Sequence, residues 1–318
     1  MKRPTSKQLV SWAGSILMVA SLVFLGRLLF EGRGDIDVAS LASAGVIAGL
    51  LLVAFFEGLG ILLAGLNFRA LVKNVSGVLV DKPLALVVYT VSNVYKYIPG
   101  GVMYVVGRNR LAVETEDLSH PDVALSTVIE GALVAIAAVV IVIITAHDHA
   151  LAYLRQLEPS TTLIVVLIVV VVLAGSALFS FRRKIAGGLK DMYGHVKLLS
   201  PFVLIKRFAF ALLIMTLWGG TFLATLAVVG QGIAPGMAPT IIGLFLLAWL
   251  AGFLTPGAPS GAGVRELIMR MALGGIVNDT TLLSAMIMHR IVAAAGDVAV
   301  YGVAVGYARI AKMREAAL

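Results

Sequence analysis

The residues of this chain that could do chemistry gather around two proline- and glycine-rich breaks in otherwise apolar sequence. At the second break, Ser260, Gly261 and Gly263 precede Arg265. Ser260 could cap a helix that begins near position 263 or 264, and the glycines would let an anion approach the backbone. A helix N-terminus attracts anions, and an arginine beside it suits bidentate phosphate contact. The pattern indicates a phosphate site; alternatively, the glycines only form the turn and Arg265 pairs with Glu266 or extends to the headgroups.

The first break carries cations beside a polar helix face. Tyr89, Asn93 and Lys96 follow the spacing i, i+4, i+7, so one face of a helix would carry all three. A lysine in an apolar arm should face the protein interior or water, or else extend to the headgroups. Arg108 follows the break as a second cation. We expect Asn93, Lys96 and Arg108 to take part in substrate binding.

Few ionisable residues lie inside the apolar segments, and these complete the candidate site. Glu57 and Glu130 flank the first break. His289, Arg290 and Asp297 lie in the last apolar segment, where the spacing of Arg290 and Asp297 places both on one helical face. Charge inside a membrane is costly, so such residues are usually functional. The alternative for Arg290 and Asp297 is a structural ion pair with each other.

The motifs of soluble enzymes are missing from the sequence. There is no cysteine, which excludes disulfides and thiolate metal sites, and there is no nucleophile elbow. His147 and His149 flank Asp148 in a predicted outer loop, which is a weak metal signal. We predict no catalytic residues, no metal, no cofactor and no enzymatic activity, with catalysis inside the membrane as a weaker alternative.

Composition shows which elements must position these residues. Apolar residues make up 60% of the chain and charged residues 13%, and the mean hydropathy is +1.00. A soluble globular chain has about 25% charged residues and less than half apolar residues. The excess apolar surface must face lipid, so we predict an all-α integral membrane protein with one transmembrane domain over residues 1–318. The net charge of +8 fits cytoplasmic loops and anionic lipid better than nucleic acid.

Apolar segments of about 20 residues can cross a hydrocarbon core about 30 Å thick. The segments that reach this length are about 8–30, 41–66, 122–146, 161–181, 203–229 and 281–308. Segments 84–98 and 240–255 would reach only about 22–24 Å at about 1.5 Å per residue. Each then breaks at Pro and Gly, and a shorter apolar arm follows.

Basic residues in the loops decide how the chain threads the membrane, because Lys and Arg concentrate on the cytoplasmic side. They gather in the amino terminus, in segments 67–83, 108–110 and 182–202, and in the carboxyl-terminal tail. Both termini are therefore expected in the cytoplasm, and 84–107 and 240–277 must enter and leave on opposite sides. We predict about six full spans and two oppositely oriented re-entrant hairpins, in inverted repeats of about 41–146 and 203–308. The alternative is eight spanning helices.

Two motifs resemble those of a known family. Segment 93–101, NVYKYIPGG, leads to Gly107 and Arg108, and segment 253–257, FLTPG, is followed by 261–266, GAGVRE. Together they resemble the motifs of the lysylphosphatidylglycerol synthase/flippase transmembrane domain, and the likeness spans most of the chain. The resemblance implies a lipid-handling domain of the cell membrane. Some family members flip aminoacylated phosphatidylglycerol, some are fused to synthase domains, and related ones accompany polyprenyl-phosphate glycosyltransferases.

We therefore expect a multi-pass protein of the cell membrane that acts as a flippase or scramblase for an anionic phospholipid or a lipid-linked phosphate. The alternative is a non-transporting subunit that presents lipid to a separate lipid-modifying enzyme or glycosyltransferase. No soluble synthase segment follows the last predicted span, so aminoacyl transfer is not expected. Membrane lipids are the expected partners. A separate lipid-modifying enzyme and a second copy of the chain (a homo-oligomer) stay open.

Overall fold

The computed structural model describes residues 41–97, 103–115, 118–156, 200–230, 233–255 and 259–315. In order, its elements are α3 (Ala44–Ser76), α4 (Lys82–Val94), η1 (Tyr95–Tyr97), α5 (Met103–Thr115), α6 (His120–Gln156), α8 (Pro201–Val229), η2 (Pro235–Met237), α9 (Ala238–Leu254), η3 (Pro259–Gly261), α10 (Val264–Leu273) and α11 (Asp279–Glu315). The elements labelled η are single 3-10 turns. No strand occurs in these ranges, so the prediction of an all-α protein is confirmed for the described residues.

Among the described residues, 4 helices are long and apolar enough to cross a membrane, namely α3, α6, α8 and α11. They coincide with the predicted spans 41–66, 122–146, 203–229 and 281–308, while spans 8–30 and 161–181 lie outside the described residues. Large apolar side chains on their outer surfaces stay exposed, with Ile144 at 72% and Phe202 at 74%. Lipid can cover such surfaces and water cannot do so without cost, which supports a membrane protein.

Local sequence sets the ends of the long helices. The Ser43 hydroxyl accepts a hydrogen bond from the Val46 N–H at the start of α3. Gly77 ends α3 in the left-handed conformation with φ 76°, a conformation that glycine adopts at little cost. Ser200 caps α8 in the same way as Ser43 caps α3, and Pro201 occupies the first turn, where no N–H is needed.

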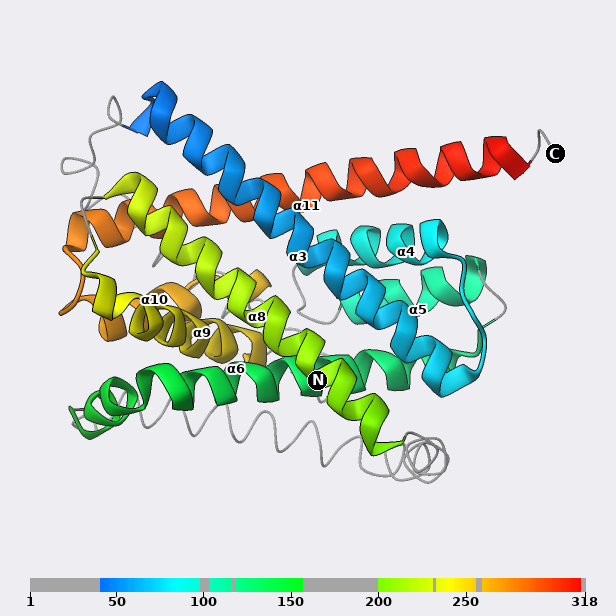
Figure 1. Ribbon diagram of the computed structural model, residues 1–318, viewed down its shortest axis with the longest axis horizontal. Coiled ribbons are helices and arrows are strands. Elements are labelled where there is room, and N and C mark those ends of the chain that lie inside the picture. Colours follow the sequence, from blue (N-terminus) through cyan, green and yellow to red (C-terminus); the bar gives the residue numbers. More distant parts are fainter. Residues whose placement is uncertain are drawn as a thin grey trace, which may run out of the picture.

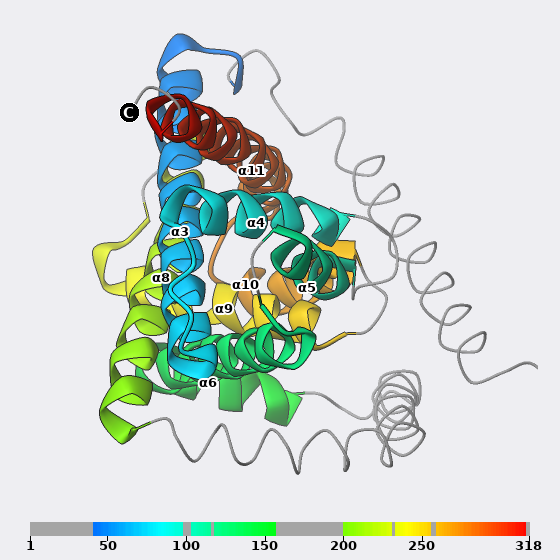
Figure 2. The same cartoon turned by 90° about the vertical axis from the view of Figure 1, so that its right-hand side faces the viewer.

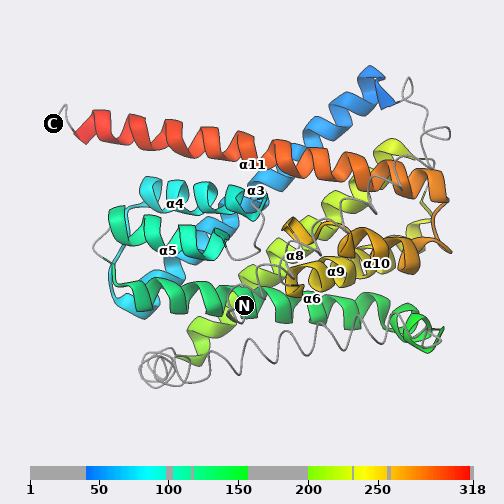
Figure 3. The ribbon, with the colours of Figure 1, turned by 180° about the vertical axis from the view of Figure 1, so that it is seen from behind.

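The shorter helices pack in two pairs at opposite ends of the molecule (Figures 1 and 3). Helices α4 and α5 lie side by side, and so do α9 and α10. In the sequence, one of the predicted Pro-Gly breaks lies between the two helices of each pair. Residues 98–102 and 256–258 of these breaks lie outside the described ranges. Between the pairs, the turns η1 and η3 contact each other, so the inner ends of the two pairs meet inside the protein.

The contacts of the first half recur in the second. Helix α3 packs against α4 and α6, and α8 packs correspondingly against α9 and α11. Contacts also cross between the halves, where α11 packs on α4 and α3, and α6 packs on α9 and α8. Viewed toward the α4–α5 end, α11 lies above this pair and α6 below it (Figure 2). Helices α3 to α6 and helices α8 to α11 therefore each contribute two long helices and one pair of shorter helices to the bundle.

A glycine allows α11 to approach α3 closely. A Cβ atom at Gly296 would lie 3.0 Å from the Ala54 carbonyl oxygen and 3.1 Å from the Glu57 Cβ, distances at which a neighbour must move. Small residues let membrane helices pack this closely. The approach brings the carboxylate of Glu57 up to the side chains of α11.

Candidate functional site

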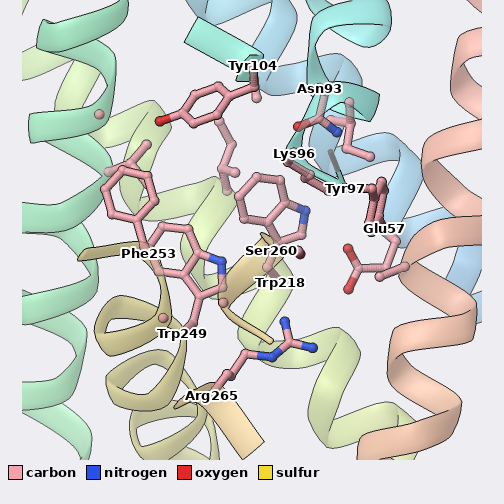
Figure 4. Close-up of a pocket in the computed structure, with 18 of the residues that line it drawn as sticks. Glu57, Asn93, Lys96, Tyr97, Tyr104, Trp218, Trp249, Phe253, Ser260 and Arg265 are labelled. Carbon is pink, nitrogen blue, oxygen red and sulfur yellow. The ribbon is translucent and has the colours of Figure 1, made fainter. Parts of the chain in front are cut away.

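A cavity of about 240 Å³ lies where the inner ends of the two helix pairs meet (Figure 4). Both pairs and all four long helices contribute to its wall. The predicted site residues that line it are Glu57, Asn93, Lys96, Arg108, Glu130, Ser260, Gly261, Arg265 and Arg290. Asp297 accepts a hydrogen bond from the lining residue Asn93, and Gly263 donates to Glu266, which pairs with the lining residue Arg290. The structure therefore brings together residues that are far apart in the sequence.

Arg108 and Glu130 form an ion pair with little exposure to solvent. Arg108 Nη1 lies 2.5 Å from Glu130 Oε2, and its Nε donates to Ser92 Oγ at 3.1 Å. The guanidinium carbon is 4.0 Å from the centre of the Tyr89 ring, and the Tyr89 hydroxyl donates to Glu130 Oε1 at 2.9 Å. Arg108 was expected with Arg110 in a basic cytoplasmic cluster, but it is only 3% exposed and is not a solvated loop residue, while its side of the membrane stays a prediction. It points into the packed side of α5, whereas Arg110 stays exposed.

Asp297 joins α11 to the inner end of the first helix pair. Its carboxylate accepts hydrogen bonds from Asn93 Nδ2 at 2.7 Å and from the Tyr97 hydroxyl at 2.5 Å. Lys96 Nζ lies 2.7 Å from the same carboxylate. The lysine therefore faces the interior, which is one of the two predicted alternatives. The prediction that Asp297 pairs with Arg290 was wrong, because Asp297 faces α4 and η1.

Arg290 instead binds Glu266 of α10. The Arg290 Nε and Nη2 atoms both lie 2.7 Å from Glu266 Oε1, and Glu266 Oε2 accepts from the Gly263 N–H at 2.7 Å. A glutamate at the third helical position that turns back to the N-terminus is a known capping arrangement. The helix begins at Val264 as predicted. Its N-terminal anion is the Glu266 carboxylate, so the predicted cap by Ser260 was wrong.

Two of the predicted anion-site residues have conformations set by the turn itself. Ser260 has φ 51° and Gly261 φ 69°, both in the left-handed region. A Cβ atom at Gly261 would lie 2.9 Å from the Gly252 Cα, which leaves no room for a side chain between η3 and α9. Glycine at position 261 is therefore required by backbone conformation and close packing, and these hold η3 at the cavity.

Arg265 differs from the other cations of the cavity. It is 9% exposed, and its buried Nε has no hydrogen-bond partner among the described residues. The nearest carboxylate oxygen, Glu266 Oε1, is 3.6 Å away and is already bonded to Arg290. In Figure 4 the guanidinium of Arg265 points into the cavity on the side of Glu57. Its Nε is therefore a buried donor that an anion in the cavity could satisfy.

Glu57 has a polar partner, but no lysine or arginine of the described ranges lies within ion-pair distance of it. Its Oε1 lies 2.6 Å from Thr221 Oγ1 and 3.5 Å from His289 Nε2. The imidazole sits edge-on to the stacked rings of Phe222 and Phe245, 5.4 and 5.2 Å from their centres. Within the described ranges, no three His, Asp or Glu side chains are grouped so that they could hold a metal ion.

The aromatic side of the cavity was missed by the sequence analysis. The ring centres of Trp218 and Trp249 are 6.5 Å apart, and Trp249 stacks on Phe253 at 5.0 Å. Tyr104 lies across from them (Figure 4). The spacing of Trp249 and Phe253 just before the second break was an available signal, since residues four apart share a helical face. The role of Glu266 was available too, as a glutamate in the third position after a glycine.

No family model matches the chain, and a search of curated proteins finds no match. The function is therefore inferred from the chemistry of the cavity.

Proposed function

We propose that the protein binds the phosphate of an anionic phospholipid or lipid-linked phosphate at Arg265 and moves that lipid across the membrane, as a flippase or scramblase does. The observation that carries this proposal is the position of Arg265: a buried cation that points into a cavity and whose Nε lacks a partner. A guanidinium offers a fork of donors that matches phosphate geometry. A buried cation in this state is stabilised by any anion that enters.

The other cations around the cavity serve a different purpose in this proposal. Lys96, Arg108 and Arg290 each have a carboxylate oxygen within 2.7 Å. These pairs position the walls, and the lipid phosphate takes the remaining cation. The headgroup occupies the cavity and the aromatic side, while the acyl chains stay in the bilayer. Moving a bare phosphate through hydrocarbon would instead cost of order tens of kcal/mol.

We further propose that the α4–α5 and α9–α10 pairs are re-entrant hairpins of opposite orientation within an inverted repeat. The recurrence of helix contacts in the two halves supports this arrangement. In Figure 1 the C-terminal ends of α3 and α11 lie at the same end of the molecule as the N-terminal ends of α6 and α8. Arg69, Lys73 and Arg309 also lie toward that end, which makes it the cytoplasmic side by the distribution of basic residues.

Cysteine labelling tests this topology directly, because the chain has no cysteine of its own. Single cysteines at Asp117 and Lys190 are expected to react with an impermeant thiol reagent only from the cytoplasmic side. Cysteines at Asp148 and Gln231 are expected to react only from outside. If position 117 is labelled from outside in intact cells, residues 84–107 cross the membrane completely and the chain has the eight-helix topology.

Transport itself is tested in proteoliposomes that carry a fluorescent anionic phospholipid. We expect the wild-type protein to move the lipid between leaflets, Arg265→Ala to reduce the rate to that of protein-free liposomes, and Arg265→Lys to recover only part of it. A lysine keeps the charge and loses the fork of donors. Arg110→Ala is the matched control. Because the Arg110 side chain is 76% exposed, we expect its removal to leave transport unchanged.

Two outcomes would contradict the transport assignment. If well-folded Arg265→Ala transports at the wild-type rate, the phosphate binds elsewhere. If the wild-type protein does not move lipid but retains it through purification, the protein presents lipid to another enzyme. Arg265→Lys keeps the test informative should Arg265→Ala lower the folded yield.

A further inference from the structure

Among the described charges around the cavity, the Glu57 carboxylate has no lysine or arginine partner, and the nearest carboxylate to Arg265, Glu266 at 3.6 Å, is already bonded to Arg290. Asp297, Glu130 and Glu266 each lie within 2.7 Å of a lysine or arginine nitrogen. Glu57 is 7% exposed, and in the described part of the chain no lysine or arginine nitrogen lies within ion-pair distance of it. Among the described residues, the only ionisable group at that distance is the His289 imidazole. A buried carboxylate without a cation is costly unless it takes up a proton.

The hydroxyl of Thr221 gives independent evidence on the state of Glu57. Thr221 Oγ1 lies 2.6 Å from Glu57 Oε1 and 2.7 Å from the carbonyl oxygen of Trp218, and both of these oxygens are acceptors in the ionised form. A hydroxyl has a single proton to donate. If Thr221 donates to its own helix backbone, the contact with Glu57 is a good hydrogen bond only when the carboxyl group donates. The geometry therefore offers a proton on Glu57 an acceptor, the Thr221 hydroxyl oxygen.

The groups that face Glu57 make its proton sensitive to what the cavity holds. Most of the charges that face Glu57 are cancelled by a partner of opposite sign. These groups are Lys96 with Asp297, Arg290 with Glu266, and Arg108 with Glu130 and Tyr89. Tyr97 donates to Asp297, and on α8 the contact to Glu57 comes from the neutral Thr221. Lys96, Asp297 and Arg265 act on Glu57, and the opposite effects of Lys96 and Asp297 largely offset each other, which leaves Arg265. This cation opposes the uptake of a proton by Glu57, whereas the burial of Glu57 favours it.

We propose that Glu57, with His289, binds one proton that enters together with the lipid phosphate and leaves with it. This inference rests on the proposed function, since it needs an anion at Arg265. A phosphate on Arg265 cancels the charge that favours ionised Glu57 and adds a negative charge to the same cavity. Glu57 then takes up a proton, and the cavity stays near neutral with the lipid bound. By reciprocity of linked equilibria, a protonated Glu57 strengthens phosphate binding to the same extent.

The consequence for transport is that a proton gradient can drive the lipid. Because lipid and proton bind together, a protein that opens to either side carries both in the same direction. The anionic headgroup and the proton then cross as a neutral combination. This avoids exposing a net charge to the low dielectric of the membrane interior.

Isothermal titration calorimetry of the full-length protein in detergent tests the coupling. The probe is dihexanoyl-phosphatidylglycerol, a phosphodiester whose charge stays constant between about pH 5 and pH 9. We expect the wild-type affinity to fall by up to about tenfold per pH unit as the pH rises, which is the slope of one linked proton. Titration in two buffers with different heats of ionisation should report about one proton taken up per lipid bound.

Glu57→Gln is expected to bind the lipid with an affinity that no longer changes with pH, and without proton uptake. It should stay near the tight, low-pH level of the wild type, because glutamine resembles the protonated carboxyl group. Glu114→Gln is the control. Glu114 is 54% exposed and pairs with Arg110 at the surface, so the wild-type pH dependence should persist.

The coupling is refuted if wild-type binding is tight, independent of pH and free of proton uptake, or if Glu57→Gln keeps the wild-type slope. The wild-type proton count decides the question even if Glu57→Gln folds poorly. Failure of the underlying function looks different. In that case the wild type does not bind the probe, or Arg265→Ala binds it as tightly as the wild type at every pH.

Discussion

Replacement of Asp297 by asparagine is expected to lower the stability of the folded protein by about 3–5 kcal/mol, the usual effect of removing one side of a buried pair. The Asp297 side chain is 1% exposed and holds Asn93, Tyr97 and Lys96 at once. Asparagine keeps the shape but leaves the Lys96 ammonium without its anion. Because Lys96 keeps 29% of its side chain exposed, the loss should fall at the lower end of this range.

The rescue of this variant identifies its partner. Adding Lys96→Met to Asp297→Asn removes the stranded charge and should restore part of the stability, whereas adding Arg290→Gln should cause a further loss. Unfolding in detergent micelles, followed by tryptophan fluorescence, gives the free energies for a double-mutant cycle. If the Lys96 and Asp297 losses simply add, the two residues do not stabilise each other.

Glu130→Gln is expected to destabilise the protein at least as strongly, by about 3–5 kcal/mol. Both oxygens of Glu130 are in use, one by Tyr89 and one by Arg108. The Arg108 side chain is only 3% exposed, so water cannot replace the lost anion. The substitution should therefore loosen the packing of α5 against α4 and α6, and faster proteolysis in this region would report it.

Glu114→Gln is the matched control for this change, because it removes the carboxylate from an arginine pair on the same helix. The Arg110 and Glu114 side chains are 76% and 54% exposed, and water solvates whichever one is left. We expect no measurable change in stability. Equal effects of the two substitutions would show that Arg108 and Glu130 are solvated in the membrane-bound protein.

The long helices could be predicted from the sequence because their signal is local. Runs such as 203–229 and 281–308 are apolar over more residues than a soluble helix needs, and α8 and α11 include them. The breaks were visible for the same reason, since Pro and Gly interrupt a helix whatever surrounds it. The number of spans and the re-entrant orientation of the hairpins stay predictions.

The charged residues that surround the cavity could also be predicted from the sequence, but which of them form ion pairs with each other could not. Charged side chains such as Lys96 and Arg265 are costly to expose to lipid, so they are expected to face the protein interior. Their presence around one cavity follows from this free-energy cost. Their partners depend on how each helix is rotated and on what packs against it. Arg290 and Asp297 share a helical face, yet α10 presents Glu266 to the first and η1 presents Lys96 to the second.

The aromatic lining escaped prediction for a different reason. Tryptophan and phenylalanine in an apolar segment look the same whether they face lipid, a neighbouring helix or a cavity. Only the assembled bundle shows that Trp218 and Trp249, from α8 and α9, meet on one side of the cavity.

The contact between Asp297 and the inner end of the first helix pair also has a consequence for biosynthesis. Asn93 and Asp297 are separated by 204 positions, so the ribosome needs about 10–40 s to pass from one to the other at about 5–20 residues per second. During that interval Lys96 is already made and its carboxylate partner is not. A nascent chain that stops before α11 would expose an unpaired ammonium group in the membrane, a feature by which membrane chaperones and quality-control proteases can recognise an unfinished protein.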